Sequence, residues 1–499
     1  MKKTYVAGLL AAAMGVILYG CTLTGEKSYP NTPFKGVVED GSKETFLRVA
    51  DATVWLIPSA DVAAMGKTPI EVKADAANDE PLEDNLAANR ARYLNAKTNA
   101  KGEFSFANVP GGKYFVYVEP ATRKYLPGGD KSRKALGTDE LGAEPMRIKI
   151  SGNVPPNATY IGSSACIECH ENQKHFTRTL HRLGMTVIGK PSKLQDFSNF
   201  PEFNKGLNKL MAGTKFWFYG YDKTRGFDKY QISTKPPADA SSVSFTATFY
   251  KDDAGNLRFR AENVKDPKDA ARIYAVDMTY GGGLYKQRYL VRVGANLFPF
   301  VQFNQYGDDS FADRTRKPWR DYHADWFFNE TTGKLVDPPV GKSFDKECAS
   351  CHYNGYTLTK KANGDYIAGS ANDRNGELDI DGDGKPNELN LGCETCHGPG
   401  SAHDKAKEID MPSTIVSPNK LSAERADVLC GQCHSRPQGF LNNDQPVNKD
   451  NKMMLPGTSR NVFLKEYTTR ADGANTDFWA DGLHSKAHHQ PYSDLIKAK

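Results

Sequence analysis

The feature that most constrains this chain is a five-residue pattern, C-x-x-C-H, which occurs four times in 499 residues. The four copies read CIECH, CASCH, CETCH and CGQCH, and together they use eight of the nine cysteines. Any fold has to place each pair of thiols on one short turn with an imidazole directly behind it. The cysteines are Cys166, Cys169, Cys348, Cys351, Cys393, Cys396, Cys430 and Cys433, and the histidines are His170, His352, His397 and His434.

This spacing suits covalent haem attachment. Two thiols on one short turn can add to the two vinyl groups of a haem as thioethers, and the adjacent histidine then gives its imidazole to the iron as proximal ligand. Other uses of paired cysteines explain the pattern less well. A disulfide framework would not place histidine after every second cysteine, and structural zinc would leave four histidines unused. A thioredoxin-like motif occurs once, beside a βαβ unit. The sequence therefore predicts four covalently bound haem c groups.

Haem iron has a second axial position, and the chain holds seven further histidines that could fill it. The expected distal ligands are His181, His403, His488 and His323. His484 competes with His323 for the fourth place, because it lies four residues before His488 and could share its helix face. His175 lies five residues after His170 and is expected to face away from that haem. Methionine is the other ligand type, although methionine more often fills a core.

The N-terminus predicts export. Lys2 and Lys3 precede the apolar run VAGLLAAAMGVIL, which is short for a membrane span, and LYGC follows. A small residue before Cys21 resembles a bacterial lipobox, which implies a signal peptide over residues 1–20, a lipid on Cys21 and a tether over 21–33. The alternative is an ordinary signal peptide followed by a stray cysteine. No other stretch approaches about 18 uninterrupted apolar residues.

Residues 34–152 contain no cysteine or histidine and read as strands separated by turns. We expect an all-β sandwich here. The segment TNAKGEFSFANVPGGKYFVYVEP resembles the carboxypeptidase regulatory-like, transthyretin-like domain, with its N-x-x-G-x-F and V-P-x-G-x-Y patterns. The resemblance implies an adhesion, spacer or docking module. SGNVPPNAT, residues 151–159, is the expected linker.

A tetrahaem cytochrome c domain is expected over residues 158–499, mainly α-helical or irregular in structure. Residues 190–330 carry no motif and include hairpin-like runs such as SVSFTATFYKDDAGNLRFRAEN, which predict a β-rich insertion. The last three motifs follow closely between residues 348 and 434. Apolar residues make up only 39% of the chain, so porphyrins would supply much of the local core there.

The segment DIDGDGKPNELN resembles a calcium-binding loop. Asp379, Asp381 and Asp383 alternate as in an EF-hand, and Asn387 fits position nine. Position twelve is Asn390, so the usual bidentate glutamate is missing. The sequence leaves two alternatives open, a Ca²⁺ site and a solvated acidic loop.

Five segments of the chain together resemble the multihaem cytochromes typified by the tetrahaem cytochrome of ammonia-oxidising bacteria, which have secreted relatives in metal-respiring bacteria. The segments are YIGSSACIECH, TLH, GCETCHGPGSAH, LCGQCHSR and SKAHHQPYSD. The resemblance covers roughly residues 158–499. It implies distal roles for His403 and His488 and, with Thr in place of the family's Ser, for His181. It also implies haems stacked nearly edge to edge, one of which can lack a sixth ligand.

Three functions follow from these expectations. The favoured one is an electron carrier, not an enzyme, in an outer-membrane lipoprotein on the periplasmic or cell-surface side, exchanging electrons with other cytochromes or extracellular metal acceptors. The second is a reductase of nitrite, hydroxylamine or sulfur compounds, with one open iron. The third is a filament, with His484, His488 or His489 lent to a second copy. A net charge of +5 without a basic run gives no sign of nucleic-acid binding. Candidate pocket residues for the reductase are Arg316, Lys317, Arg320 and Tyr322.

Overall fold

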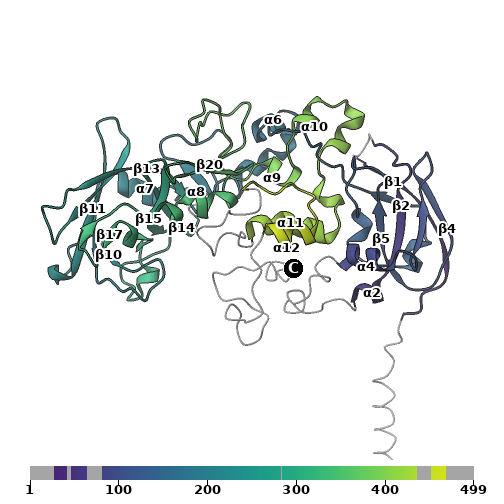
Figure 1. The fold of residues 1–499 in the computed structure, drawn as a ribbon, viewed down its shortest axis with the longest axis horizontal. Coiled ribbons are helices and arrows are strands. Elements are labelled where there is room, and N and C mark those ends of the chain that lie inside the picture. The colour runs from purple at the N-terminus through teal and green to yellow at the C-terminus, as the bar shows by residue number, and fades with distance from the viewer. Residues whose placement is uncertain (1–26, 42–45, 64–80, 282–283, 435–450, 468–499) are drawn as a thin grey trace, which may run out of the picture.

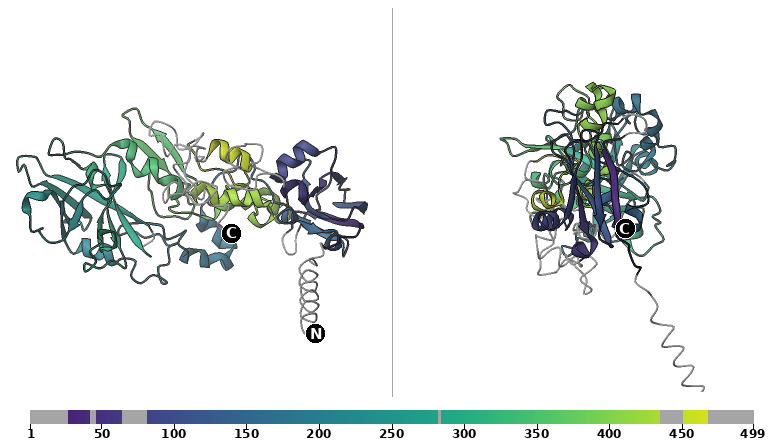
Figure 2. Two further views of the ribbon diagram at one scale, coloured as in Figure 1. Left: turned by 90° about the horizontal axis from the view of Figure 1, so that it is seen from below. Right: turned by 90° about the vertical axis from the view of Figure 1, so that its right-hand side faces the viewer.

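The computed structural model describes residues 27–41, 46–63, 81–281, 284–434 and 451–467 (Figure 1). Three parts follow one another along the long axis. A β-sandwich forms one end, a large curled sheet forms the other, and the four motifs lie between them (Figures 1 and 2). Cys21, His484, His488 and His489 lie outside the described residues. Within the described ranges, none of the helices combines the length and apolarity needed to cross a membrane.

The sandwich consists of two antiparallel-rich sheets that share one core. Alternation in β4, EFSFANV, sends Phe104 and Phe106 inward, where they pack on Phe34 of β1. The first sheet has the order β4-β1-β7 and the second the order β3-β2-β5-β6. Their bounds are β1 Thr32–Glu39, β2 Thr53–Pro58, β3 Leu94–Lys97, β4 Glu103–Val109, β5 Lys113–Glu119, β6 Leu136–Gly137 and β7 Met146–Lys149.

Helices modify the all-β expectation for this part. Helix α4, Pro81–Asn89, covers the outer face of the second sheet, where Leu82 and Leu86 pack on Trp55 and Tyr117. That face carries large aromatic side chains on β2 and β5, and these have to be buried. Two shorter helices, α2 (Ser59–Ala63) and α5 (Thr138–Leu141), lie beside the strands.

At the other end of the molecule, a nine-stranded antiparallel sheet nearly closes on itself. Its two end strands are joined near β10 and β16, where Tyr230 N donates to Asp321 Oδ2 over 2.8 Å. Its interior is rich in phenylalanine, including Phe218, Phe245 and Phe300. The β-rich stretch expected within residues 190–330 is present, and the sheet also includes β8, which lies before residue 190. The strands are β8 Met185–Val187, β9 Thr214–Tyr219, β10 Gln231–Ser233, β11 Val243–Lys251, β12 Leu257–Asn263, β13 Arg272–Tyr280, β14 Lys286–Val293, β15 Asn296–Asn304 and β16 Trp319–Asp321.

A bulge in β13 connects this sheet to the second motif. Tyr274 and Val276 face the sheet interior, whereas Met278 and Tyr280 belong to a different core. The register shift between Val276 and Met278 reverses the alternation, because one extra residue moves every later side chain to the other face. The outer face so formed packs on the segment that carries Cys348.

The central part contains short helices and few strands. Its helices are α6 Ser163–Cys169, α7 Lys205–Met211 (under the large sheet), α8 Phe344–Glu347, α9 Cys393–His397, α10 Ser401–Lys405, α11 Ala423–His434 and α12 Arg460–Glu466. One small hairpin completes it, β19 Thr357–Lys360 with β20 Tyr366–Gly369. A second hairpin, β17 Phe328–Asn329 with β18 Lys334–Leu335, packs against the large sheet, where Phe328 and Leu335 join its core. Hydrogen bonds within helices and strands therefore account for little of the stability of this central part.

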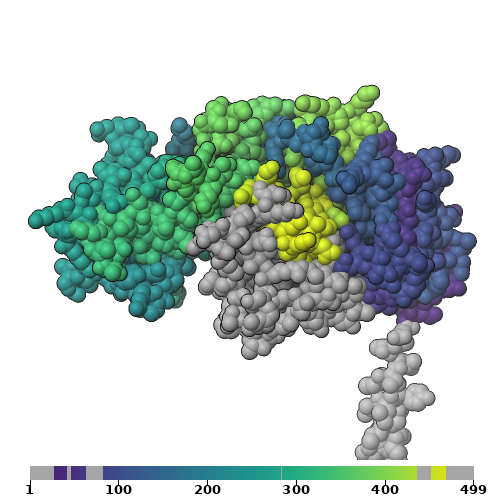
Figure 3. All heavy atoms as spheres, viewed as in Figure 1, coloured from purple at the N-terminus to yellow at the C-terminus, as the bar shows by residue number. Residues whose placement is uncertain are grey.

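The predicted linker is packed against the body of the protein. Ser151 and Gly152 are buried, and Ser151 Oγ accepts a hydrogen bond from Ser417 N over 2.8 Å. Arg133 donates to the carbonyl of Pro418 over 2.7 Å, and Leu126 of the sandwich packs with Leu421. On the face in Figure 3, the 451–467 segment (yellow) lies directly against the sandwich (blue). The sandwich is therefore packed directly against the central part and is not joined to it by an extended linker alone.

Candidate haem centre

Each motif lies on a short helix or helical turn, which places its first and fourth residues on one face. The first motif spans α6 with His170 at the C-cap, and the third is α9 itself. The fourth ends α11, and the second follows α8, continuing through a 3₁₀ turn over Ala349–Cys351. All eight motif cysteines are free thiols. Each thiol pair is therefore available on one turn beside its histidine, as thioether attachment requires.

Two pairs of histidines from distant parts of the chain face one another. The rings of His170 and His403 have centroids 6.3 Å apart and planes inclined by 20°. The rings of His181 and His434 have centroids 6.3 Å apart and planes inclined by 73°. Two imidazoles bound on opposite sides of one metal ion would have centroids about 6.4 Å apart, given about 2.0 Å from metal to nitrogen and about 1.2 Å from nitrogen to centroid. The residues present therefore fit bis-histidine ligation at the first and fourth motifs.

Backbone carbonyls orient two of these rings. His403 Nδ1 lies 3.0 Å from the carbonyl oxygen of Met411, and His397 Nδ1 lies 2.8 Å from that of Val416. A carbonyl can only accept, so Nδ1 carries the proton in both rings and Nε2 keeps its lone pair for a metal. This second contact is typical of metal-binding histidines.

The charge state of the histidines also suits ligation. Burial, with a smaller effect of Arg288, lowers the pKa of His352 to about 4. Burial likewise lowers the pKa of His397 and of His181. A metal ligand must be neutral imidazole, and depressed pKa values keep these rings neutral at physiological pH.

His323, an expected distal ligand, lies on the large sheet beside aromatic residues. Its ring stacks on Trp326 at 3.9 Å and lies 4.9 Å from the ring of Tyr322. The rings nearest to His352 are those of Tyr280 at 5.7 Å and Phe344 at 5.8 Å. Among the described residues, no histidine ring faces His352 as His403 faces His170.

Contacts between the motifs give their order in space. Cys393 N donates to Ser163 Oγ over 2.7 Å at the start of α6, so the first motif adjoins the third. Gln432 Nε2 donates to the carbonyl oxygen of Thr395 over 3.2 Å, which joins the third motif to the fourth. Cys351 Sγ lies 3.7 Å from the carbonyl oxygen of Cys433, which joins the fourth to the second. The motifs are therefore neighbours in the order first, third, fourth, second.

A buried polar network holds the motifs together, and no local sequence pattern predicts it. Arg182 and Glu388 form a fully buried ion pair with an N–O distance of 2.9 Å. Glu388 also accepts from Ser163 N over 3.1 Å, before the first motif, and from Asn354 Nδ2 over 2.6 Å, after the second. Glu394, inside CETCH, accepts from Gly162 N over 2.8 Å. The network spans segments that are far apart in the sequence, so only the fold brings it together.

The alternatives for the cysteines do not match this geometry. Among the described residues, the one group of three or more metal-ligand side chains whose atoms converge within 4.8 Å is Asp379, Asp381 and Asp383. No cluster of thiols resembling a structural zinc site is therefore present in that part of the chain. The eight free thiols likewise form no disulfide framework.

The same acidic group is the predicted calcium loop. All three residues are exposed, and partial desolvation of the Asp381 carboxylate together with the neighbouring carboxylates raises its pKa. Asn387, the expected fourth ligand, is buried, and its Oδ1 accepts from Ile380 N over 2.8 Å. Three of the four expected ligands gather, and Ca²⁺ binding stays a prediction.

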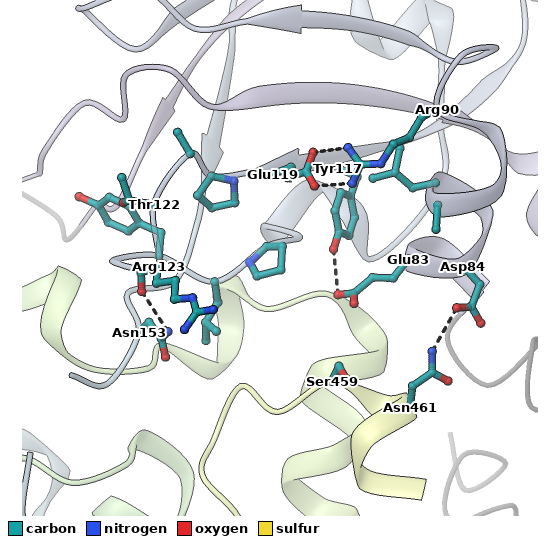
Figure 4. A pocket seen from close by; sticks show the side chains of 17 residues that line it. Glu83, Asp84, Arg90, Tyr117, Glu119, Thr122, Arg123, Asn153, Ser459 and Asn461 are labelled. Atoms are coloured by element: carbon teal, nitrogen blue, oxygen red, sulfur yellow. Dashed lines mark hydrogen bonds and ion pairs between the residues drawn. The ribbon is translucent and has the colours of Figure 1, made fainter. Parts of the chain in front are cut away.

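A cavity of about 590 Å³ lies at the seam between the sandwich and α12 (Figure 4). Its polar groups are largely paired with one another. Arg90 forms an ion pair with Glu119, and Asn461 of α12 donates to Asp84 over 3.1 Å. None of the residues that line the cavity belongs to a C-x-x-C-H motif.

The residues expected to line a reductase pocket have different partners, although Phe227 lies against both Arg320 and Tyr322. Arg320 pairs with Asp228 over 2.8 Å, and the guanidinium of Arg316 stacks on Phe311 at 3.7 Å. Tyr322 instead faces Arg288, whose guanidinium carbon lies 4.0 Å from its ring centroid. Arg288 carries no sequence motif, and its position against the second motif follows from strand register.

Comparison of the chain with family models, curated proteins and solved structures finds no match. A function has to be argued from the chain's own residues.

Proposed function

We propose that this chain is a tetrahaem c-type cytochrome that transfers electrons. The observation that carries the proposal is the pair of histidine contacts, each at 6.3 Å, which link a motif histidine to one from another motif's segment. When bound, the four haems would supply one-electron chemistry. The cysteines would attach them, His170 with His403 and His434 with His181 would hold two of the irons, and His352 and His397 would be the proximal ligands of the others.

The order of the motifs supports transfer along a line. Neighbouring motifs contact one another through residues in or beside them, so cofactors attached there would be close neighbours. The protein contributes rigid spacing, imidazole ligands and an enclosed setting. The line would run from the first motif to the second, which rests on the large sheet.

The cellular setting is part of the same proposal. A signal peptide and a lipid on Cys21 would hold the protein at the outer membrane, on its periplasmic or cell-surface side. The partners would be other redox proteins, such as periplasmic or outer-membrane cytochromes, or extracellular metal acceptors. The N-terminal part would be a transthyretin-like docking module fused to the cytochrome region.

One observation favours a second candidate, a multihaem reductase with an open iron. The rings that lie against His352 are those of Tyr280 and Phe344, and none of them belongs to a described histidine. An iron there with a single imidazole could bind a small substrate such as nitrite or hydroxylamine.

A haem count combined with electron paramagnetic resonance of the ferric protein tests both candidates. Four haems per chain, all low-spin, would support the carrier. Four haems with about a quarter of the iron high-spin would support an open site, because a missing axial ligand weakens the ligand field. Fewer than four haems in protein made by cells competent for cytochrome c maturation would contradict the proposal.

A further inference from the structure

Arg288 holds a charge beside the second motif that nothing described in the chain neutralises. It lies on β14, on the same outer face as Leu290, which packs with Phe344 and Ala349 at the motif. Its guanidinium stacks on Tyr322, with 4.0 Å from its central carbon to the ring centroid, and its Nε donates to Gln302 Oε1 over 2.9 Å. The side chain is therefore fixed in place by neutral partners.

Two tyrosine hydroxyls share this site. The ring of Tyr280 lies 5.2 Å from the guanidinium of Arg288 and 5.7 Å from the ring of His352. Its hydroxyl interacts with Tyr322 and with Arg288.

Other arginines of the same sheet all have carboxylate partners. Three examples are the ion pairs Arg292–Asp277, Arg258–Asp252 at 2.8 Å and Arg320–Asp228 at 2.8 Å. No carboxylate among the described residues pairs with Arg288. Burial, followed by repulsion from Arg288 and Arg320, lowers the pKa of Lys286, which indicates an excess of positive charge here.

A partly buried guanidinium with no carboxylate partner is unfavourable, because burial removes part of the water that would otherwise stabilise the charge. A fork of N–H donors flanked by two hydroxyls matches the oxygen atoms of a carboxylate or a small oxyanion.

We propose that Arg288, Tyr280 and Tyr322 form a binding site for an anionic oxygen group at the haem carried by Cys348, Cys351 and His352. This inference rests on the proposed cytochrome function. The group would come from one of two sources, a propionate of that haem or a small oxyanion from solution. The two sources share one chemistry and differ in what a mutation and an added anion would change.

The test uses the full-length holo-protein, first counted for haem, and three variants. Arg288→Gln removes the charge, Arg288→Lys keeps it, and Arg258→Gln removes a paired arginine of the same sheet as a matched control. Each protein is titrated with nitrite while the optical and paramagnetic resonance spectra are followed. The reduction potentials of its four haems are then measured by spectroelectrochemistry.

A solution anion predicts that nitrite perturbs one haem of the native protein, and that Arg288→Gln weakens this response about tenfold or more, the loss of one charge-assisted contact. A propionate predicts no nitrite response and a shifted potential for one haem in Arg288→Gln, with a smaller shift in Arg288→Lys. Spectra and potentials of Arg288→Gln equal to those of native protein would overturn the proposal.

Two further outcomes distinguish a failure of the cytochrome proposal from a failure of this site. A haem count below four in native protein would contradict the cytochrome proposal itself and not this site alone. Should Arg288→Gln fail to incorporate haem, Tyr322→Phe takes its place. The loss of one hydroxyl donor should then weaken the nitrite response or shift the same single potential, and a Tyr322→Phe protein indistinguishable from native would overturn the site.

Discussion

At the scale of single residues, the histidines divide by what surrounds them. His403 is oriented by a carbonyl and faces a motif histidine, whereas His175 is exposed and only lies 3.3 Å from the Asn172 carbonyl oxygen. His323 has a ring neighbour on both sides but none from a motif. Under the proposed function, the ligand roles would follow from what each ring faces and not from the residue type.

Replacing His403 by alanine should convert one iron to the high-spin state. The trans imidazole of His170 would lose its partner, so about a quarter of the ferric signal should change spin state. Electron paramagnetic resonance of the purified variant measures this. His175→Ala is the control and should leave the spectrum unchanged. A fully low-spin spectrum for His403→Ala would show that the 6.3 Å contact does not mark an axial pair.

The buried ion pair makes a second residue-scale prediction. Arg182→Met should lower the stability of the folded protein by about 3–5 kcal/mol, because it leaves the buried Glu388 carboxylate without its counter-charge. Denaturant unfolding followed by absorbance at the haem bands measures the loss. Arg178→Met removes an exposed pair with Asp196 and should cost about 0–1 kcal/mol. Equal losses in the two variants would contradict a special role for the buried pair.

At the scale of elements, a bulge in one strand and a left-handed residue after another determine which side chains of the large sheet face outward. The bulge in β13 turns Tyr280 outward to the second motif. The residue after β16, Tyr322, also faces outward, and His323 follows in a left-handed conformation at φ 71°. Close packing of the large sheet's end strands encloses His323, and burial, with repulsion from Arg288, lowers its pKa to about 3 from an ordinary value of 6.5.

The titration of His323 predicts an acid-sensitive sheet. The unfolded chain takes up a proton near pH 6.5 and the folded chain only near pH 3, so the unfolded state binds more protons between these values. The stability gained from neutral His323 is complete above pH 6.5 and is lost as the pH falls toward 3, by at most about 1.4 kcal/mol per unit.

His323→Asn should reduce this pH dependence, because asparagine does not titrate and tolerates the left-handed backbone. Melting temperatures between pH 4 and 7 measure the slope, with His175→Asn as the exposed control. An unchanged slope in His323→Asn would contradict the burial argument. A new high-spin haem signal in the same variant would instead identify His323 as an axial ligand.

Gly152 joins the sandwich to the central part with no room for a side chain. A β-carbon there would overlap the carbonyl oxygen of Pro412 and lie 2.6 Å from the carbonyl carbon of Ser413. Gly152→Ala should therefore destabilise the docked arrangement by about 1–3 kcal/mol and increase cleavage near residue 155 in limited proteolysis. Gly226→Ala, with open space around it, is the matched control. Unaltered proteolysis of Gly152→Ala would mean that the sandwich is not held through this contact.

At the scale of the whole molecule, the four motifs lie between two β-rich ends (Figure 2). The sandwich docks on the side of the third and fourth motifs through Ser151 and Leu126, and the large sheet covers the second motif. A line of cofactors so placed would be covered at the second motif by the large sheet and flanked at the third and fourth motifs by the sandwich.

Replacing Cys21 by alanine should release the protein from membranes. A lipid on Cys21 would be its only attachment under the proposed arrangement, so the variant should move from the membrane fraction to the soluble fraction of the producing cells. Immunoblotting of the fractions and a haem stain measure this, with native protein alongside. A Cys21→Ala protein that remains in the membrane fraction with full haem content would contradict lipid anchoring.

The sequence by itself determined the chemistry that depends on neighbouring residues. A cysteine pair and the histidine behind it occupy one helical turn, so C-x-x-C-H predicts thioether attachment and a proximal ligand from neighbouring residues alone. Alternating side chains likewise identified the strands of the sandwich and the β-rich insertion, because strand periodicity is local.

Only the tertiary structure decided which segments meet. His403 faces His170 and His181 faces His434 because the third motif packs on the first and the segment after the first packs on the fourth. Arg182 finds Glu388, and Arg288 reaches the second motif, through strand register and loop packing. Such contacts join residues far apart in the chain, and their free energy comes from burial and pairing in the assembled core, which no local pattern records.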